Sequence, residues 1–264
     1  MNISVSELYI YPLKSCRGIA LQSAEVEAFG LQHDRRWMLI DDDGVMLTQR
    51  KHARMCLIQP EIIPAGLRLQ AEAMPVLEVK IPASDNRIKA RVWHDEVQAW
   101  DAGDAAAKWF SDFLDTSCRL VYFPQDEMRQ VDLDYARPGD RTAFSDGFPL
   151  LLISQASLDN LNQRLDNEVT IQRFRPNLVV SGCEAHAEDS WKQLRIGGMN
   201  FRVVKPCSRC VIPSINIDTA QREEQPLKAL TEYRRRDGKI YFGQNVIAEG
   251  TGVIETGMPV EVLL

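Results

Sequence analysis

The chain has 264 residues, of which 45% are hydrophobic, enough for a sizeable core in one large or two modest domains. Its net charge of −6 excludes a broad nucleic-acid-binding surface, because such surfaces gain affinity by neutralising phosphates. The sequence has no apolar run near the roughly 20 residues that span a bilayer, and it does not start like a signal peptide. We therefore expect a cytoplasmic protein that does not enter a membrane.

The first hundred residues are short apolar runs broken by Gly, Pro, Asn and Asp, a pattern that predicts strands joined by tight turns. The clearest predicted hairpin joins residues 37–40 to residues 45–48 through the turn DDDG. Apolar residues alternate at 67, 69 and 71 and again at 77, 79 and 81, as in half-buried antiparallel strands. We expect an open or closed β-barrel here.

Residues 103–115 (GDAAAKWFSDFLD) place apolar side chains at helical spacing, which predicts an amphipathic helix that links two halves of the chain. We place the domain boundary soon after it. The prediction is an N-terminal β-barrel-like domain at 1–120 and a second domain at 121–264.

In the second half, Ser154 is placed to cap a helix over residues 155–165, and Pro226 opens a third helix that ends in the basic residues 234–236. The segments RFRPNLVVSG, QLRIGGMNFRVVK and RCVIPSINI between these helices are predicted strands, as is most of FGQNVIAEGTGVIETGMPVEVL near the end. Strands with a few interspersed helices indicate an α+β, β-rich protein rather than a doubly wound sheet.

The densest chemical signal is KPCSRC at residues 205–210, because two thiols beside two cations favour a thiolate. A zinc site would need a second pair of ligands, and the other cysteines and the four histidines show no paired spacing. A thioredoxin-like motif should open a helix, whereas VIPSINI after the pair is a predicted strand. No spacing for an iron–sulfur cluster is present. Two buried structural cysteines remain the plain alternative.

Several long motifs besides the cysteine pair are distributed over nearly the whole chain. They are YPLKSCRG at 11–18, GLQHDRRWMLID at 30–41, PLLLISQASLDNLNQRL at 149–165, FRPNLVVSGCEAHAEDSW at 174–191, CSRC at 207–210, PLKALTEYRR at 226–235 and FGQNVIAEGTGVIETGMPV at 242–260. In these motifs the chain resembles the MOSC domain proteins, and among them the YcbX proteins and the mitochondrial amidoxime-reducing components. The resemblance implies an N-terminal MOSC-associated β-barrel domain packed on a MOSC β-barrel domain.

The resemblance also implies a molybdenum cofactor, in which molybdopterin presents a dithiolene, a hydrogen-bonding ring system and a phosphate. In these families the second cysteine of the CSRC-like motif binds the metal, which maps to Cys210, and a metal-bound thiol is deprotonated. Cys207 then becomes a structural neighbour. The matched cofactor-binding positions are Lys14, Ser15, Arg35, Asp146, Gly147, Phe148, Arg175, Asn177, Ser208, Arg209, Cys210 and Asn245.

Among these positions, the resemblance gives the phosphate to Lys14, Arg35 and Arg175, which supply the cations that a phosphate needs. Taken singly, each of them is an ordinary surface charge or turn residue, and Asn245 is an ordinary turn residue before a strand. His186, in HAED, is interpreted as part of a polar turn with no catalytic role. Many relatives carry Val-Asp-Pro after the cysteines, where this chain has Ile215-Asn216-Ile217, which leaves substrate preference open.

The resemblance implies a molybdenum enzyme that reduces N-hydroxylated compounds, such as hydroxylamines, amidoximes or N-hydroxylated bases, with the cofactor carrying the redox step. Some YcbX proteins add a ferredoxin domain, and this chain ends at Leu264 without cluster-ligand spacing. We therefore expect electrons from a separate flavoprotein reductase or ferredoxin-type protein. Two alternatives stay open, a cofactor carrier or sulfur-transfer protein and a structural barrel that binds no cofactor.

Overall fold

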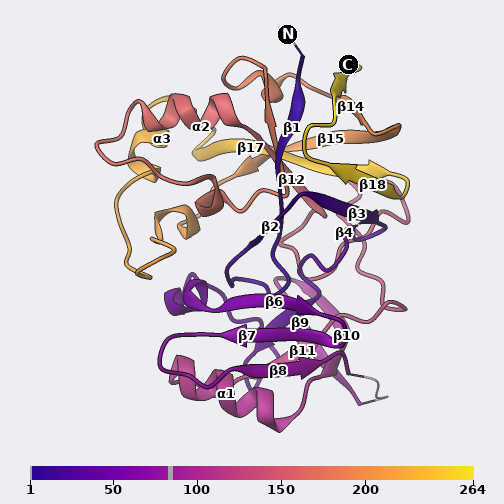
Figure 1. Cartoon of the computed structure of the whole chain (residues 1–264), viewed down its shortest axis with the longest axis vertical. Coiled ribbons are helices and arrows are strands. Elements are labelled where there is room, and N and C mark those ends of the chain that lie inside the picture. Colours follow the sequence, from indigo (N-terminus) through magenta and orange to yellow (C-terminus); the bar gives the residue numbers. More distant parts are fainter. Residues whose placement is uncertain (1, 83–85) are drawn as a thin grey trace.

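The computed structural model describes residues 2–82 and 86–264, and within them it contains three α-helices, four 3-10 helices and nineteen strands in four sheets. The protein is therefore α+β and rich in β-structure, as predicted. Figure 1 shows two regions, with β6 to β11 and α1 at one end and the longest sheet at the other. Both termini lie at the far end of that longest sheet.

The largest sheet has nine strands in the order β19-β14-β15-β17-β12-β13-β1-β2, with β16 paired to β17. Its strands are antiparallel except for the parallel pair β12–β13. Their bounds are Ser4–Ile10 (β1), Ile19–Leu21 (β2), Leu150–Ser154 (β12), Leu178–Ser181 (β13), Gln193–Ile196 (β14), Met199–Ser208 (β15), Arg235–Arg236 (β16), Lys239–Glu249 (β17) and Val260–Val262 (β19).

Three smaller sheets complete the fold, with strand orders β5-β11-β10-β9, β6-β7-β8 and β18-β3-β4. Their strands are Ser23–Glu27 (β3), Gly30–Leu31 (β4), Trp37–Ile40 (β5), Gln59–Ile63 (β6), Gly66–Gln70 (β7), Leu77–Lys80 (β8), Arg87–Val92 (β9), Asp95–Asp101 (β10), Arg119–Tyr122 (β11) and Gly252–Glu255 (β18). The α-helices are Asp104–Leu114 (α1), Gln155–Asn162 (α2) and Leu227–Arg234 (α3). The 3-10 helices are Ala53–Leu57 (η1), Ile171–Phe174 (η2), Ala187–Asp189 (η3) and Ile212–Ser214 (η4).

Alternation along the central strands separates two cores on the two faces of the large sheet. In β12, Leu150 and Leu152 pack into one core while Leu151 and Ile153 pack into the other. Successive side chains of a strand point to opposite faces, so a strand buried on both faces is apolar throughout. The second core is closed by α2 and α3, which lie together on one side in Figure 1.

The strands near the start of the chain pair with strands from its second half. β1 pairs with β2 and β13, and β3 pairs with β18. The two sequence halves are therefore interleaved in space, and the boundary near residue 120 stays a prediction.

The predicted helices are present, with shifted ends. Helix α1 buries Ala106, Trp109, Phe110, Phe113 and Leu114 along one face, as its spacing predicted. Helix α2 has the predicted cap, because the Ser154 side chain accepts a hydrogen bond from the Ser157 N–H, but it ends at Asn162. Helix α3 follows Pro226, and its predicted basic end becomes the short strand β16.

Three strand predictions need correction. The predicted hairpin at 37–48 is reduced to a single antiparallel bridge, Ile40↔Met46. The strand that pairs with β5 along its length is β11. The predicted strand over RFRPNLVVSG begins only at Leu178, because η2 occupies residues 171–174. The predicted strand over VIPSINI is wrong, since residues 212–214 form the 3-10 helix η4. Pro213 has no N–H to give to a sheet, and a proline is well tolerated at a helix start.

Candidate functional site

The twelve residues matched to the cofactor site all line one cavity of about 540 Å³, although they come from segments spread between positions 14 and 245. The cavity is also lined by Thr48, Arg50 and Trp93 from the first half of the chain. Among the described residues that line it, seven are Lys or Arg and one is acidic. A cavity with this charge balance attracts an anionic ligand.

Cys210 lies just past the end of β15, where the chain leaves the sheet and turns into η4. Its side chain is half-buried and lines the cavity, and its Sγ accepts a hydrogen bond from Arg50 Nη2 at 3.3 Å. Cys207 also lines the cavity, but it packs against the core beneath α2 and α3, and burial raises the pKa of its thiol. Of the two thiols, Cys210 therefore has the environment that suits a metal-binding thiolate.

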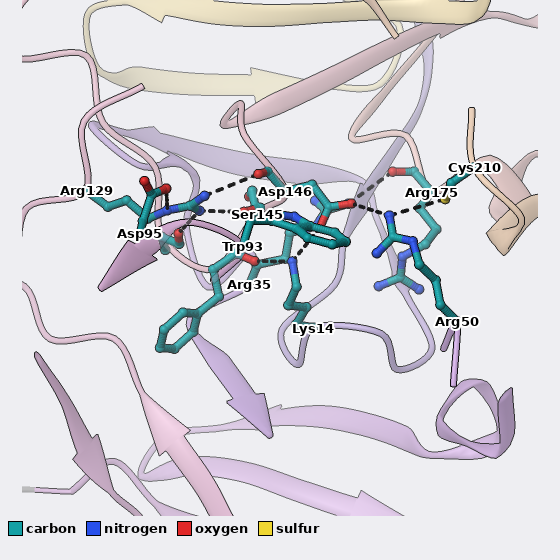
Figure 2. Close-up of polar contacts among 12 residues, drawn as sticks. Lys14, Arg35, Arg50, Trp93, Asp95, Arg129, Ser145, Asp146, Arg175 and Cys210 are labelled. Carbon is teal, nitrogen blue, oxygen red and sulfur yellow. Dashed lines mark hydrogen bonds and ion pairs between the residues drawn. The ribbon is translucent and has the colours of Figure 1, made fainter. Parts of the chain in front are cut away.

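Asp146 is the polar centre of the cavity (Figure 2). Its Oδ1 accepts hydrogen bonds from Lys14 Nζ at 2.6 Å and Trp93 Nε1 at 3.3 Å, and its Oδ2 lies 3.4 Å from Arg50 Nη2. Burial acts to raise the pKa of this carboxyl, but the charge and hydrogen bond of Lys14, with Arg50 and Arg35, lower it well below its usual range. Asp146 is thus a fixed anion that orients the groups around it.

Lys14 is a buried lysine held at two points. Its Nζ donates to the Phe144 carbonyl at 2.7 Å and to Asp146, and only 6% of its side-chain surface is exposed. Burial lowers the pKa of this ammonium to about 8, against the opposing attraction of Asp146. Because the carboxylate already compensates its charge, Lys14 adds less to anion binding than the sequence predicted.

Arg35 and Arg175 lie over the same aromatic ring, with their Cζ atoms 4.6 Å and 4.1 Å from the centroid of Tyr11. Arg35 forms an ion pair with buried Asp34 at 2.5 Å. Among the described residues, Arg175 forms no ion pair with an Asp or Glu. Its Nη1 donates to the Cys16 carbonyl at 2.6 Å. Arg175 is therefore the less compensated of the two charges.

Several arginines that line the cavity have orphaned donor atoms, among them Arg175 and Arg209. Arg175 Nη2 and Arg209 Nη2 are buried and have no hydrogen-bond partner among the described residues. The rest of the Arg209 guanidinium bonds to backbone carbonyls, with Nε 2.8 Å from that of Phe242 and Nη1 2.9 Å from that of Phe174. Buried donors without partners are costly, so these two positions fit the anionic end of a ligand.

The backbone around the cavity holds left-handed residues that are not glycine. Ser15 has φ 68°, Arg35 φ 48°, Trp93 φ 57° and Arg175 φ 58°, and all four line the cavity. Such conformations cost free energy for residues with a Cβ and gather at functional sites. Gly243 has φ 80°, and a Cβ there would lie 2.6 Å from Ile153 and 3.3 Å from Arg209 Nη2, so glycine leaves room for that guanidinium.

The remaining predicted residues take mixed positions. Asn177 is fully used within the protein, since its Oδ1 accepts from Arg35 and from the Leu151 N–H while its Nδ2 donates to the Tyr9 carbonyl. Asn245 donates to the Lys205 carbonyl at 3.2 Å. Gly147, Phe148 and Ser208 line the cavity, as does Ser15, which is buried. Asn177 therefore positions Arg35 more than it offers a hydrogen bond to a ligand.

Asn216, the departure from the relatives' pattern, is not among the residues that line the cavity. Its Oδ1 accepts from the Asp218 N–H at 3.0 Å and its Nδ2 donates to Glu223 Oε1 at 2.9 Å. It shapes the loop after η4, which carries Glu223 to its ion pair with Arg173.

Sequence reasoning missed two of the best-placed side chains, Arg50 and Trp93. Both lie in turns of the first half, outside the motifs that carried the resemblance, and only the tertiary fold brings them to Cys210 and Asp146. No prediction from the sequence covered either residue. The structural importance of the HAED segment was also underestimated. Its Glu188 is fully buried and accepts hydrogen bonds from the hydroxyls of Ser154 and Ser157.

Comparison with known proteins identifies the family. Residues 2–117 match the MOSC N-terminal beta barrel domain, and residues 139–261 match the MOSC domain. Mitochondrial amidoxime-reducing component 1 of Homo sapiens is 38% identical over 98% of this chain and 83% of its own length. The chain belongs to the MOSC domain proteins. Within this family it groups with the amidoxime-reducing components, as the resemblance implied.

Other MOSC relatives agree with this placement. Mitochondrial amidoxime reducing component 2 is 36% identical in Bos taurus and 35% identical in Homo sapiens, each over 97% of this chain and 82% of the relative. The solved structure of the YuaD protein from Bacillus subtilis matches 98% of this chain and 94% of its own, at a TM-score of 0.45 and 12% identity, and supports no functional conclusion.

The described part of the chain lacks two features. Within residues 2–82 and 86–264, no three His, Cys, Asp or Glu side chains gather in a way that would hold a metal ion. Across the same residues, no helix has the length and apolar character needed to cross a bilayer.

Proposed function

We propose that this MOSC protein is a molybdenum-cofactor-dependent reductase of N-hydroxylated compounds. The observation that carries the proposal is the placement of Cys210 Sγ inside a cationic cavity that also holds the orphaned donors of Arg175 and Arg209. A single thiolate suits a metal whose other ligands come from a cofactor, and unpartnered arginines suit the phosphate of that cofactor. The names of the relatives support the substrate class.

The residues divide the work by position. Cys210 would supply a thiolate to the metal, with its sulfur held by Arg50. Arg175 and Arg209 would bind the phosphate through their free Nη2 atoms, while Arg35 is fixed by Asp34 and Asn177. Lys14 and Asp146 form the polar floor between them. When bound, the cofactor supplies the two-electron chemistry that the side chains lack.

The proposed reaction is a two-electron, two-proton reduction. An amidoxime takes up two electrons and two protons, its N–O bond breaks, the oxygen leaves as water and an amidine remains. The protein holds the cofactor and the substrate in one water-accessible cavity. The electrons come from a separate protein, which we propose to be a flavoprotein reductase or a ferredoxin-type carrier.

The location of Cys210 favours the reductase over a cofactor carrier or sulfur-transfer protein. A carrier has to present its thiol to a partner enzyme, whereas Cys210 is half-buried and lines a cavity of about 540 Å³.

The test is expression in a host that makes molybdopterin, followed by metal analysis and by benzamidoxime reduction with a chemical electron donor. Wild-type protein should carry molybdenum and form benzamidine, and Cys210→Ala should lose both. Cys207→Ala is the matched control, and it should retain both because the Cys207 side chain packs against the core and has no hydrogen bond from Arg50. A wild-type protein free of molybdenum, or a Cys210→Ala variant that keeps metal and activity, would refute the proposal.

A further inference from the structure

A stacked pair of side chains, Arg50 on Trp93, forms one wall of the cavity. The Arg50 Cζ atom lies 4.4 Å from the centroid of the Trp93 ring, and both residues line the cavity. Trp93 occupies the turn between β9 and β10 with φ 57°, and it stays 41% exposed. A bulky residue in a left-handed conformation is strained, and an exposed tryptophan offers a face to a ligand.

The neighbouring Asp146 holds both members of the pair (Figure 2). Asp146 accepts a hydrogen bond from Trp93 Nε1 and pairs with Arg50 Nη2. Arg129 ties the same hairpin to the same loop, since its Nε lies 2.7 Å from Asp95 and its Nη2 donates to the Asp146 carbonyl at 3.2 Å. A wall fixed before binding loses little entropy when a ligand arrives.

The wall lies directly beside the sulfur of the proposed metal ligand. Arg50 Nη2 is 3.3 Å from Cys210 Sγ, while Arg50 Nη1 is buried and has no hydrogen-bond partner among the described residues. A free guanidinium donor at this point suits an oxygen acceptor, and the adjacent indole suits a flat group. The contacts proposed for the cofactor leave both features unused.

The substrate and the product of the proposed reaction differ in charge. An N-hydroxylated amidine is uncharged at neutral pH, because its oxygen weakens the base, whereas the amidine that remains after N–O cleavage is protonated. A fixed guanidinium repels a bound cation and tolerates a neutral molecule. Here the cavity has seven cationic side chains against one carboxylate among its described lining residues.

We propose that Arg50 and Trp93 form the substrate subsite, in which the Trp93 ring carries a flat, uncharged N-hydroxylated group and Arg50 Nη1 donates a hydrogen bond to its oxygen. Arg50 also repels the cationic product, so the subsite favours substrate over product. This inference rests on the proposed reductase function and names the substrate class and the residues that select it.

The test is calorimetric binding of benzamidoxime and benzamidine to cofactor-loaded protein without an electron donor, with affinities expressed per molybdenum atom. Replacement of the charge in Arg50→Gln should weaken benzamidoxime binding about tenfold and tighten benzamidine binding several-fold, so the two ligands move in opposite directions. The matched control Arg50→Lys keeps the charge and should leave benzamidine binding within about twofold of wild type.

A second pair of variants tests the aromatic platform without touching Cys210. Trp93→Ala should weaken benzamidoxime about tenfold, and Trp93→Phe should restore most of that loss. The subsite is overturned if Arg50→Gln shifts both ligands in the same direction or if Trp93→Ala leaves benzamidoxime binding unchanged. These measurements need no turnover, so failure of the subsite is distinguishable from failure of wild-type protein to reduce benzamidoxime.

Discussion

The guanidinium of Arg50 lies 3.3 Å from the sulfur of Cys210, although the two residues are 160 positions apart in the chain. A second contact reinforces this link, because Arg222, beyond η4, donates to the Arg50 carbonyl. The segment after the cysteine motif is thus fixed to the first half of the chain at the point where the proposed metal would bind.

The Asp146 carboxylate should matter for stability as well as for the site. In Asp146→Asn, buried Lys14 loses its counter-charge, and we expect the free energy of unfolding to fall by about 1 kcal/mol, a modest value because Asp146 remains partly exposed. Urea unfolding of the cofactor-free protein measures the change. Asp218→Asn, which removes an exposed partner of Arg17, is the control and should change stability little. Equal losses in the two variants would contradict this account of Lys14.

Glu188 should be a strong structural determinant despite its location in a polar turn. Its carboxylate accepts from the Ser154 N–H at 3.1 Å and from the hydroxyls of Ser154 and Ser157 at 2.9 and 2.7 Å. Glu188→Ala leaves the Ser154 N–H and at least one of the two hydroxyls without an acceptor, since the hydroxyls can bond only to each other, and this should cost about 3 kcal/mol in thermal or urea unfolding. Exposed Glu184 is the comparison, and Glu184→Ala should lie within about 0.5 kcal/mol of wild type.

The left-handed backbone at Ser15 permits a test that separates conformation from side-chain chemistry. Ser15→Gly should be at least as stable as wild type, because glycine adopts φ 68° without strain. Ser15→Val should lose about 1–2 kcal/mol, because a β-branched residue is poorly tolerated there. If the hydroxyl contacts the cofactor, Ser15→Gly will lower the molybdenum content of a fully folded protein. Equal stability of the Gly and Val variants would show that the backbone is not strained.

Buried thiols should weaken the fold at high pH. Burial raises the pKa of Cys56 from 9.0 to about 11, so between these values the unfolded chain has lost a proton that the folded chain still holds. The free energy of unfolding therefore falls as pH rises from 9 to 11, by up to about 1.4 kcal/mol per unit for this thiol.

Urea unfolding at several pH values between 7 and 11 measures the slope, and Cys56→Ala should reduce it. Buried Val180 has no titrating group, so Val180→Ala should lower stability equally at every pH. An unchanged slope in Cys56→Ala would show that other groups cause the loss.

The sequence predicted the candidate site best where the site residues lie in the long motifs. Lys14, Arg35, Arg175 and Cys210 were selected from separate motifs, and the fold gathers them around one cavity. The helix over residues 103–115 and the strands within 193–205 were also predicted from their apolar periods, and the second of these strands runs on to Ser208 in the structure.

What the sequence could not predict depends on contacts between distant segments. Arg50 and Trp93 resemble ordinary turn residues, and only the pairing with Asp146 and Cys210 distinguishes them. Residues 211–217 carry β-branched side chains that favour a strand, but Pro213 and the bond from the Ser214 hydroxyl to the Val211 carbonyl at 2.7 Å select a tight turn. Lys14 and Arg35 were predicted as available cations, yet Asp146 and Asp34 already neutralise them.

The pairing of the first strands with the last has a consequence for biosynthesis. The Val5 N–H donates to the Met258 carbonyl at 2.9 Å, and β3 requires β18 as its neighbour. β1 and β3 can pair early with β2 and β4, but while the protein emerges from the ribosome their contacts with the last segment must wait until almost the whole polypeptide has been made. During that interval the two strands expose free edges that attract other chains. A nascent chain released before its final segment is translated would consequently be a substrate for chaperones and proteases.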